Sequence, residues 1–102
     1  MLESTIERRL VERVKQLGGM ALKFTSPGHA GVPDRIVIVP GHVYFVELKQ
    51  LHGSLTPLQI ETHNRLRDLG VDVRTLYGKD YVDGFLEEVK RAFQSVSVPE
   101  GR

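Results

Sequence analysis

Cysteine and tryptophan are both absent from the 102-residue chain. Without cysteine the chain can form neither a disulfide framework nor a zinc site built from thiolates. The longest apolar runs have the length of a strand, far short of the ~20 residues that cross a bilayer. The first residues also lack the basic and then apolar pattern of a signal peptide. These absences predict a soluble cytoplasmic protein with no membrane partner.

An excess of one charge sign is also missing, because 14 Lys and Arg side chains face 13 Asp and Glu side chains. This balance neither supports nor excludes a DNA partner, since a metal-site nuclease needs only local basic patches to hold phosphates. The four histidines form no HExxH pattern, and no glycine-rich loop leads from a strand into a helix. The sequence therefore argues against a zinc hydrolase and a P-loop enzyme.

The centre of the chain has the pattern of a β-hairpin. The runs Arg35–Val39 and Val43–Lys49 are rich in β-branched and aromatic residues, and Pro40-Gly41 lies between them. Proline at the second position and glycine at the third suit a type II turn. If these two residues form the whole turn, the numbers of paired residues sum to 81 along the ladder.

That register places two carboxylates opposite each other, on Asp34 and Glu47. Lys49 lies two residues beyond Glu47, so its side chain projects from the same face. Like charges opposite each other repel, and a divalent cation between them removes the repulsion, because carboxylate oxygens are what Mg²⁺ or Mn²⁺ prefers. Taken alone, the acidic pair fits a metal site and an accident about equally, and Lys49 taken alone is more simply a salt-bridge partner.

Helix and strand patterns surround the hairpin. The expected elements are, in order, helix 3–17, strand 20–25, the two hairpin strands, helix 57–69, strand 71–77 and helix 80–93. This order predicts an α/β fold, αβββαβα, in which helices flank a mixed sheet and strand 71–77 runs parallel to the second hairpin strand. Residues 1–93 are expected to form one domain, and 94–102 a polar, frayed tail.

The helix expected at 57–69 has a clear start signature. Thr56 is a suitable N-cap, Pro57 suits the first turn, and Gln59 lies where a capping box places its glutamine. The apolar positions predict a core face made up of Leu58, Thr62, Leu66 and Leu69. His63 is expected on the helix surface.

Glu7 lies inside the apolar arc of the first helix, where a carboxylate needs a partner. Ser4 lies three residues before it, so the two fit a capping box at the helix start. From spacing alone, a capping residue and a metal ligand are equally good interpretations of Glu7.

Pro33-Asp34, a spacer that contains a strand, and Glu47-Leu48-Lys49 together resemble the PD-(D/E)XK nuclease signature. More narrowly, the chain resembles the stand-alone, virus-type VRR-NUC domains of that superfamily. Glu7, Gly31-Val32-Pro33-Asp34 and Leu55-Thr56-Pro57-Leu58-Gln59 stand where the motifs of that family would. The resemblance covers nearly the whole chain.

The resemblance implies a restriction-endonuclease-like core and metal-dependent hydrolysis of DNA. The implied ligands of Mg²⁺ or Mn²⁺ are Asp34, Glu47, the backbone carbonyl of Leu48 and Glu7. The implied catalytic residues are Asp34, Glu47, Lys49 and Gln59. In this interpretation Lys49 orients water or neutralises charge on the phosphate, and Gln59 faces the active site instead of serving only as a cap.

The resemblance further implies branched substrates such as four-way junctions. A domain of this size presents one site, so cutting two strands requires a homodimer. If the source is viral, the expected compartment is the host cytoplasm. Two other classes stay open from the sequence: a nuclease-like DNA-binding module without turnover, and a scaffold domain whose acid–lysine cluster is a structural ion network.

Overall fold

The computed structural model describes residues 2–95, and their side chains as far as residue 92. Its elements are, in chain order, α1 (Glu3–Gln16), β1 (Met20–Lys23), β2 (Arg35–Val39), β3 (His42–Lys49), α2 (Pro57–Asp68), β4 (Val73–Tyr77) and α3 (Gly78–Ser95). This is the expected order αβββαβα. The expected tail begins too early, because α3 continues through Ser95. The rest of that tail, 96–102, lies outside the described residues.

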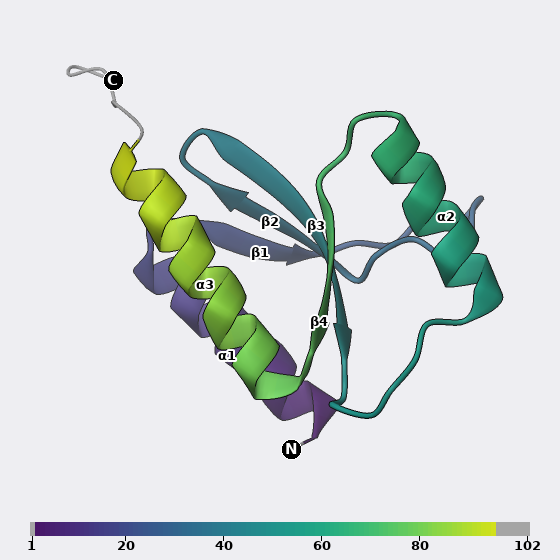
Figure 1. Cartoon of the computed structure of the whole chain (residues 1–102), viewed down its shortest axis with the longest axis horizontal. Coiled ribbons are helices and arrows are strands. Elements are labelled where there is room, and N and C mark those ends of the chain that lie inside the picture. The colour runs from purple at the N-terminus through teal and green to yellow at the C-terminus, as the bar shows by residue number, and fades with distance from the viewer. Residues whose placement is uncertain (1, 96–102) are drawn as a thin grey trace.

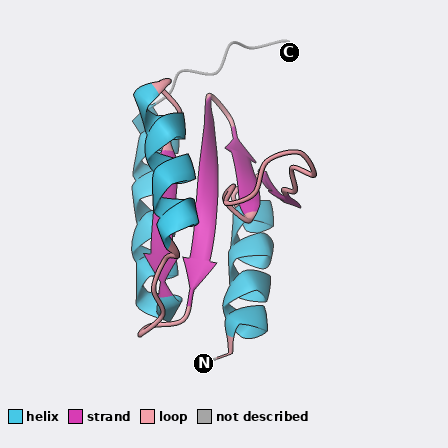
Figure 2. Ribbon diagram, turned by 90° about the vertical axis from the view of Figure 1, so that its right-hand side faces the viewer, coloured by secondary structure: helices cyan, strands magenta, loops and turns pink. Residues whose placement is uncertain are grey.

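The four strands form one mixed sheet in the order β1-β2-β3-β4. β1 and β2 pair antiparallel, as do β2 and β3, whereas β4 runs parallel to β3 as expected. Figure 1 shows α1 and α3 against one side of the sheet and α2 on the other. In Figure 2 the strands, in magenta, lie between helices on both sides. The chain is therefore a three-layer α/β structure.

The main core lies between the sheet and the α1–α3 pair. α1 buries Ile6, Leu10 and Val14, which recur every four residues and so line one face of the helix. They meet residues of β2, β3 and β4 and the apolar stripe of α3: Val37, Val39, Tyr44, Val46, Leu48, Leu76, Val82, Phe85, Leu86 and Val89. Burying a side chain of this size stabilises the fold by roughly 1.5–3 kcal/mol relative to exposing it.

A charge cluster joins the two helices of that layer. Arg9 of α1 binds Asp83 of α3 through two hydrogen bonds, the shorter of them 2.7 Å, and Lys79 lies 3.1 Å from the same carboxylate. The Arg9 guanidinium, with Lys79, lowers the pKa of Asp83 to about 2. Since the Asp83 carboxylate is about one-third exposed, its ion pairs fix the helix orientation more than they stabilise the fold.

The hairpin has the predicted register. Val39 pairs with His42, and the ladder runs on through Ile36 with Phe45. Gly41 has φ of 82°, the positive value that the third position of a type II turn requires. The ladder ends at Arg35, one pair short of the expected Asp34–Glu47 pair.

Two local predictions about the helices were wrong. Ser4 does not cap α1: the helix begins after an extended Leu2, with no side-chain cap hydrogen bond. In α2, Leu58 and Leu69 are 48% and 66% exposed, although both were expected in the core. The loop before β2 is the reason, because Gly31 (φ 85°) lies so close to α2 that a Cβ there would be 2.8 Å from Oγ1 of Thr62. Contact with this loop, and not apolar periodicity, decides which face of α2 is buried.

In the described part of the chain, no helix is long and apolar enough to cross a membrane.

Candidate active site

Asp34 lies at the entry to β2, directly after the buried Pro33. Its backbone carbonyl accepts a hydrogen bond from the Phe24 N–H at 2.8 Å, which continues the pairing of β1 with β2. Its side-chain Oδ2 accepts a second hydrogen bond from the Leu48 backbone N–H at 3.1 Å. These two bonds hold the Asp34 carboxylate beside β3, next to Glu47.

Glu47 projects from β3 towards α2 and is 2% exposed. Its Oε2 lies 3.5 Å from Nε2 of Gln59 and 3.8 Å from Nζ of Lys49. Its Oε1 has no hydrogen-bond partner. The structure thus brings Asp34, Glu47, Lys49 and Gln59 together, as the sequence predicts, and it leaves one buried carboxylate oxygen unpaired.

The electrostatics of this pair are unfavourable without an added positive charge. Burial raises the pKa of Glu47 from 4.5 to about 8, and the neighbouring Asp34 carboxylate adds to the rise. Lys49 opposes the rise, and Glu3 in the first turn of α1 contributes to it. A carboxyl group with this pKa keeps its proton at neutral pH unless a cation favours the ionised form.

Gln59 both caps α2 and contacts Glu47, so its two proposed roles are compatible. It closes the capping box of α2: its backbone N–H donates to Thr56 Oγ1 at 3.1 Å, and its Oε1 accepts from the Thr56 N–H at 2.9 Å. Because the cap occupies Oε1, the amide NH₂ is directed to Glu47 Oε2. The helix start therefore fixes the orientation of a side chain in the site.

Glu7 has a different partner from the one expected. Its Oε1 accepts a hydrogen bond from Nη2 of Arg35 at 3.0 Å, and its side chain is 30% exposed. Arg35 follows Asp34 directly, so strand alternation turns it towards the α1 side of the sheet and away from Glu47. The capping box with Ser4 is absent, and Glu7 is held by an arginine in this structure.

A divalent cation fits the carboxylate pair. Within residues 2–95, no three or more His, Cys, Asp or Glu side chains are grouped to hold a metal by themselves. Mg²⁺ seldom needs such a cage, because one or two carboxylates hold it while water and substrate phosphate complete the coordination. The raised pKa of Glu47, to which burial and the neighbouring Asp34 contribute, fits a cation beside Asp34 and Glu47. Leu48 has its side chain in the core, so only its backbone could contribute.

Comparison with known proteins gives the family. No family model matches the chain. Over 79 residues it is 47% identical to a curated protein described as "Putative nuclease p44" of Acyrthosiphon pisum secondary endosymbiont phage 1, and the match spans 76% of this chain and 85% of that relative. A solved structure described as a VRR_NUC domain matches with a TM-score of 0.79 at 33% identity, over 83% of this chain and 94% of the other. The chain belongs to the VRR-NUC family. The family and the fold class expected from the sequence are both confirmed.

One residue of this VRR-NUC site was misjudged from the sequence. His63 was expected on the surface of α2 but is 0% exposed, with Nε2 at 3.7 Å from Oε1 of Glu47. Neither ring nitrogen makes a hydrogen bond of standard geometry. Burial lowers the pKa of His63 and the Arg67 charge lowers it further, whereas the Asp34 charge and a contact with the Gly31 backbone oppose the change. Its position four residues after Gln59, on the same helix face, was the available signal.

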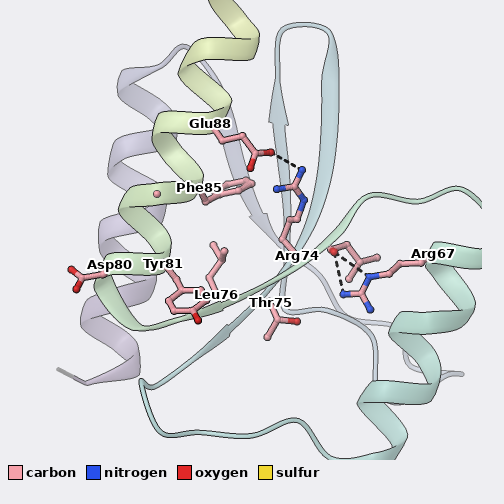
Figure 3. A pocket seen from close by; sticks show the side chains of 10 residues that line it. Arg67, Arg74, Thr75, Leu76, Asp80, Tyr81, Phe85 and Glu88 are labelled. Carbon is pink, nitrogen blue, oxygen red and sulfur yellow. Dashed lines mark hydrogen bonds and ion pairs between the residues drawn. The ribbon is translucent and has the colours of Figure 1, made fainter.

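A pocket of about 690 Å³ lies away from this site of the VRR-NUC domain, between β4, α3 and the end of α2. Figure 3 shows that Arg74 reaches Glu88 and that Arg67 donates to the backbone carbonyl of Val73. Arg74 also binds Asp72 at 2.6 Å. Both arginines of the pocket are therefore held by partners within the fold.

Proposed function

We propose that this VRR-NUC domain is a metal-dependent DNA endonuclease that hydrolyses phosphodiester bonds. The observation that carries the proposal is the buried Glu47 carboxyl group, next to Asp34 and with Lys49 on the same face. Such a pair is unfavourable to the fold by itself, because burial and the neighbouring Asp34 both disfavour the ionisation of Glu47. The 47% identity to a phage protein described as a nuclease supports the same conclusion.

Each side chain has a distinct role in this proposal. Asp34, Glu47 and the Leu48 carbonyl would hold Mg²⁺ or Mn²⁺, and the bound cation would supply Lewis-acid polarisation of the scissile phosphate. Lys49 stands beside Oε2 of Glu47, where an ammonium neutralises charge that develops on the phosphate oxygens. The amide of Gln59, fixed by the capping box, orients water or substrate at the same oxygen.

Glu7 is retained in the proposal as a further ligand. Its carboxylate is bound to Arg35 in this structure, so it reaches the site only when that ion pair opens. Because Arg35 is mostly buried, its guanidinium then needs another acceptor. Breaking the Glu7–Arg35 ion pair therefore costs free energy before Glu7 can bind a metal.

We also propose that the substrate is branched DNA, such as a four-way junction, and that two copies of the chain act together. The family resemblance of the sequence motifs supports the substrate class. One carboxylate pair per chain supports the second part, because two strands are then cut by two subunits. Light scattering coupled to gel filtration tests the dimer directly.

The deciding experiment is cleavage of labelled DNA with Mg²⁺ or Mn²⁺ and with chelator. Four-way junction, linear duplex and single strand are compared under the same conditions. Asp34→Asn and Lys49→Met each remove one proposed catalytic group, and Lys90→Met on the exposed side of α3 is the matched control. We expect cutting that needs the cation, favours the junction, is lost in both site variants and is retained in the control.

Other outcomes would change the proposal in defined ways. Equal cutting of all three substrates would remove the junction preference but keep the nuclease. Tight binding without cutting would replace the enzyme with a DNA-binding module. Cutting by Asp34→Asn at the wild-type rate would move the active site elsewhere.

A further inference from the structure

We propose that His63 is a positioning residue whose Nε2–H holds Oε1 of Glu47, so that Oε2 is presented to the bound cation. The inference rests on the proposed function, because it assigns an outer partner to a proposed metal ligand. It adds a residue that none of the sequence motifs contains.

The first argument is the distribution of unpaired polar atoms. Four buried side-chain atoms in the described residues lack a hydrogen bond, and three of them are Oε1 of Glu47 and the two ring nitrogens of His63. Buried polar atoms are nearly always paired. A buried atom without a partner has lost its hydrogen bonds to water and gained none in the protein, which costs free energy. Three of these atoms lie on Glu47 and His63, whose side chains face each other. This indicates that the two side chains can form a hydrogen bond after a small movement.

The second argument is geometry. Nε2 of His63 lies 3.7 Å from Oε1 of Glu47, just outside hydrogen-bond range. An approach of about 0.7–0.8 Å brings the two atoms to the usual N–H···O distance. Oε2 points the other way, towards Gln59 and Lys49. Once a cation holds the carboxylate ionised, both oxygens are acceptors, and His63 is the donor already facing Oε1.

The third argument is how His63 is held. The adjacent Thr62 donates from Oγ1 to the Ala30 carbonyl at 3.2 Å, and Gly31 packs directly against this turn of α2. The same loop leads into Asp34. One loop therefore sets the position of a proposed metal ligand and of the residue that orients the other ligand. Such outer contacts fix the orientation of metal ligands, and losing one costs typically 10–100-fold in metal affinity.

A purely structural histidine is the alternative, and stability separates the two. A histidine that stabilised the fold through hydrogen bonds would lower the melting temperature when replaced by an apolar residue. Here neither ring nitrogen makes a hydrogen bond of standard geometry, although a contact with the Gly31 backbone acts to raise the pKa of the ring. An apolar residue of similar shape removes the cost of burying the two ring nitrogens, so its effect on stability should be small. The positioning role thus predicts weaker metal binding without loss of stability.

The test uses the full chain and Mn²⁺ alone, by titration calorimetry, with melting curves measured in chelator. His63→Phe and His63→Leu remove the donor, with Leu covering the case in which Phe does not fit. His63→Gln keeps an N–H donor. Val89→Ala is the control, because it removes buried volume from the core between the sheet and the α1–α3 pair, on the opposite side of the sheet from α2.

We expect the apolar variants to bind Mn²⁺ about 10–100-fold more weakly, with melting temperatures equal to or above that of the wild type. His63→Gln should recover much of the affinity, and Val89→Ala should lower the melting temperature with little change in affinity. A second measurement is ¹⁵N NMR of the wild type with Mg²⁺, which is diamagnetic, in place of Mn²⁺. We expect the His63 ring to carry its proton on Nε2 in that spectrum.

Two results would overturn the inference in different ways. Wild-type affinity in both apolar variants would show that His63 does not orient Glu47, while the proposed nuclease would stand. A wild-type chain that binds neither Mn²⁺ nor Mg²⁺, with or without DNA, would overturn the proposed function and this inference with it.

Discussion

Replacing Glu47 with glutamine removes a buried titrating group and keeps the shape of the side chain. In the folded chain the pKa of Glu47 rises from 4.5 to about 8, chiefly through burial. Between these two pH values the folded state binds more protons than the unfolded state. The stability of the metal-free wild type is therefore fully present below about pH 4.5 and falls as pH rises towards 8.

The size of the effect follows from the same shift. Each unit of pKa difference is worth about 1.4 kcal/mol, so at pH 7 the metal-free wild type has lost about 3 kcal/mol relative to pH 4. Glu47→Gln does not titrate and keeps that stability. The free energy of unfolding of the variant, relative to wild type, should therefore grow by about 3 kcal/mol from pH 4 to pH 7.

Urea unfolding in chelator at pH 4, 5, 6, 7 and 8, followed by circular dichroism, measures this difference. Glu12→Gln, at an exposed position of α1, is the control and should follow the wild type at every pH. A divalent cation at 100 times its Kd should return about 2.7 kcal/mol to the wild type and nothing to Glu47→Gln. Parallel pH profiles for Glu47→Gln and wild type would refute the reasoning.

Three further predictions concern the scaffold. Gly31→Ala should destabilise the fold by about 1–3 kcal/mol in urea unfolding, because φ is 85° and Thr62 blocks the Cβ, whereas Gly28→Ala, with nothing within 4 Å, should cost far less. Wild type should be more stable than Asp83→Asn at pH 5, and melting curves should show this advantage disappearing as pH falls from 3.8 towards about 2, where the lowered pKa of Asp83 lies. Leu10→Ala should cost about 2–5 kcal/mol by chemical denaturation, against at most about 0.5 kcal/mol for the exposed Leu69→Ala; equal costs would contradict the core assignment.

Most of the fold followed from local signals in the sequence. Pro40-Gly41 set the hairpin turn, and the turn then determined which residues pair. Thr56 and Gln59 marked the start of α2 to the residue. Such signals work because each acts over a few neighbouring residues, where backbone geometry and one or two hydrogen bonds decide the outcome.

The errors lie where distant segments decide. Apolar spacing predicts a core face of α2 that includes Leu58 and Leu69, but the buried face is the one at the Gly31 loop, which carries Thr62 and His63. The spacing of Glu7 fits a capping residue or a metal ligand, yet in the structure Glu7 binds Arg35, a residue 28 positions away. Strand alternation could have placed Arg35 on the α1 side of the sheet. The acid–lysine cluster was predictable because its three members lie on one hairpin.

The double use of Gln59 restricts how this protein can change. Capping boxes accept glutamate as readily as glutamine, and a glutamate would suit the positive end of the α2 dipole. At this position, however, it would set a third acid against Oε2 of Glu47. A library selected for helix stability alone would therefore drift towards a residue that damages the site. Gln59 contributes both to the stability of α2 and to the proposed active site, so a substitution that improves one can impair the other.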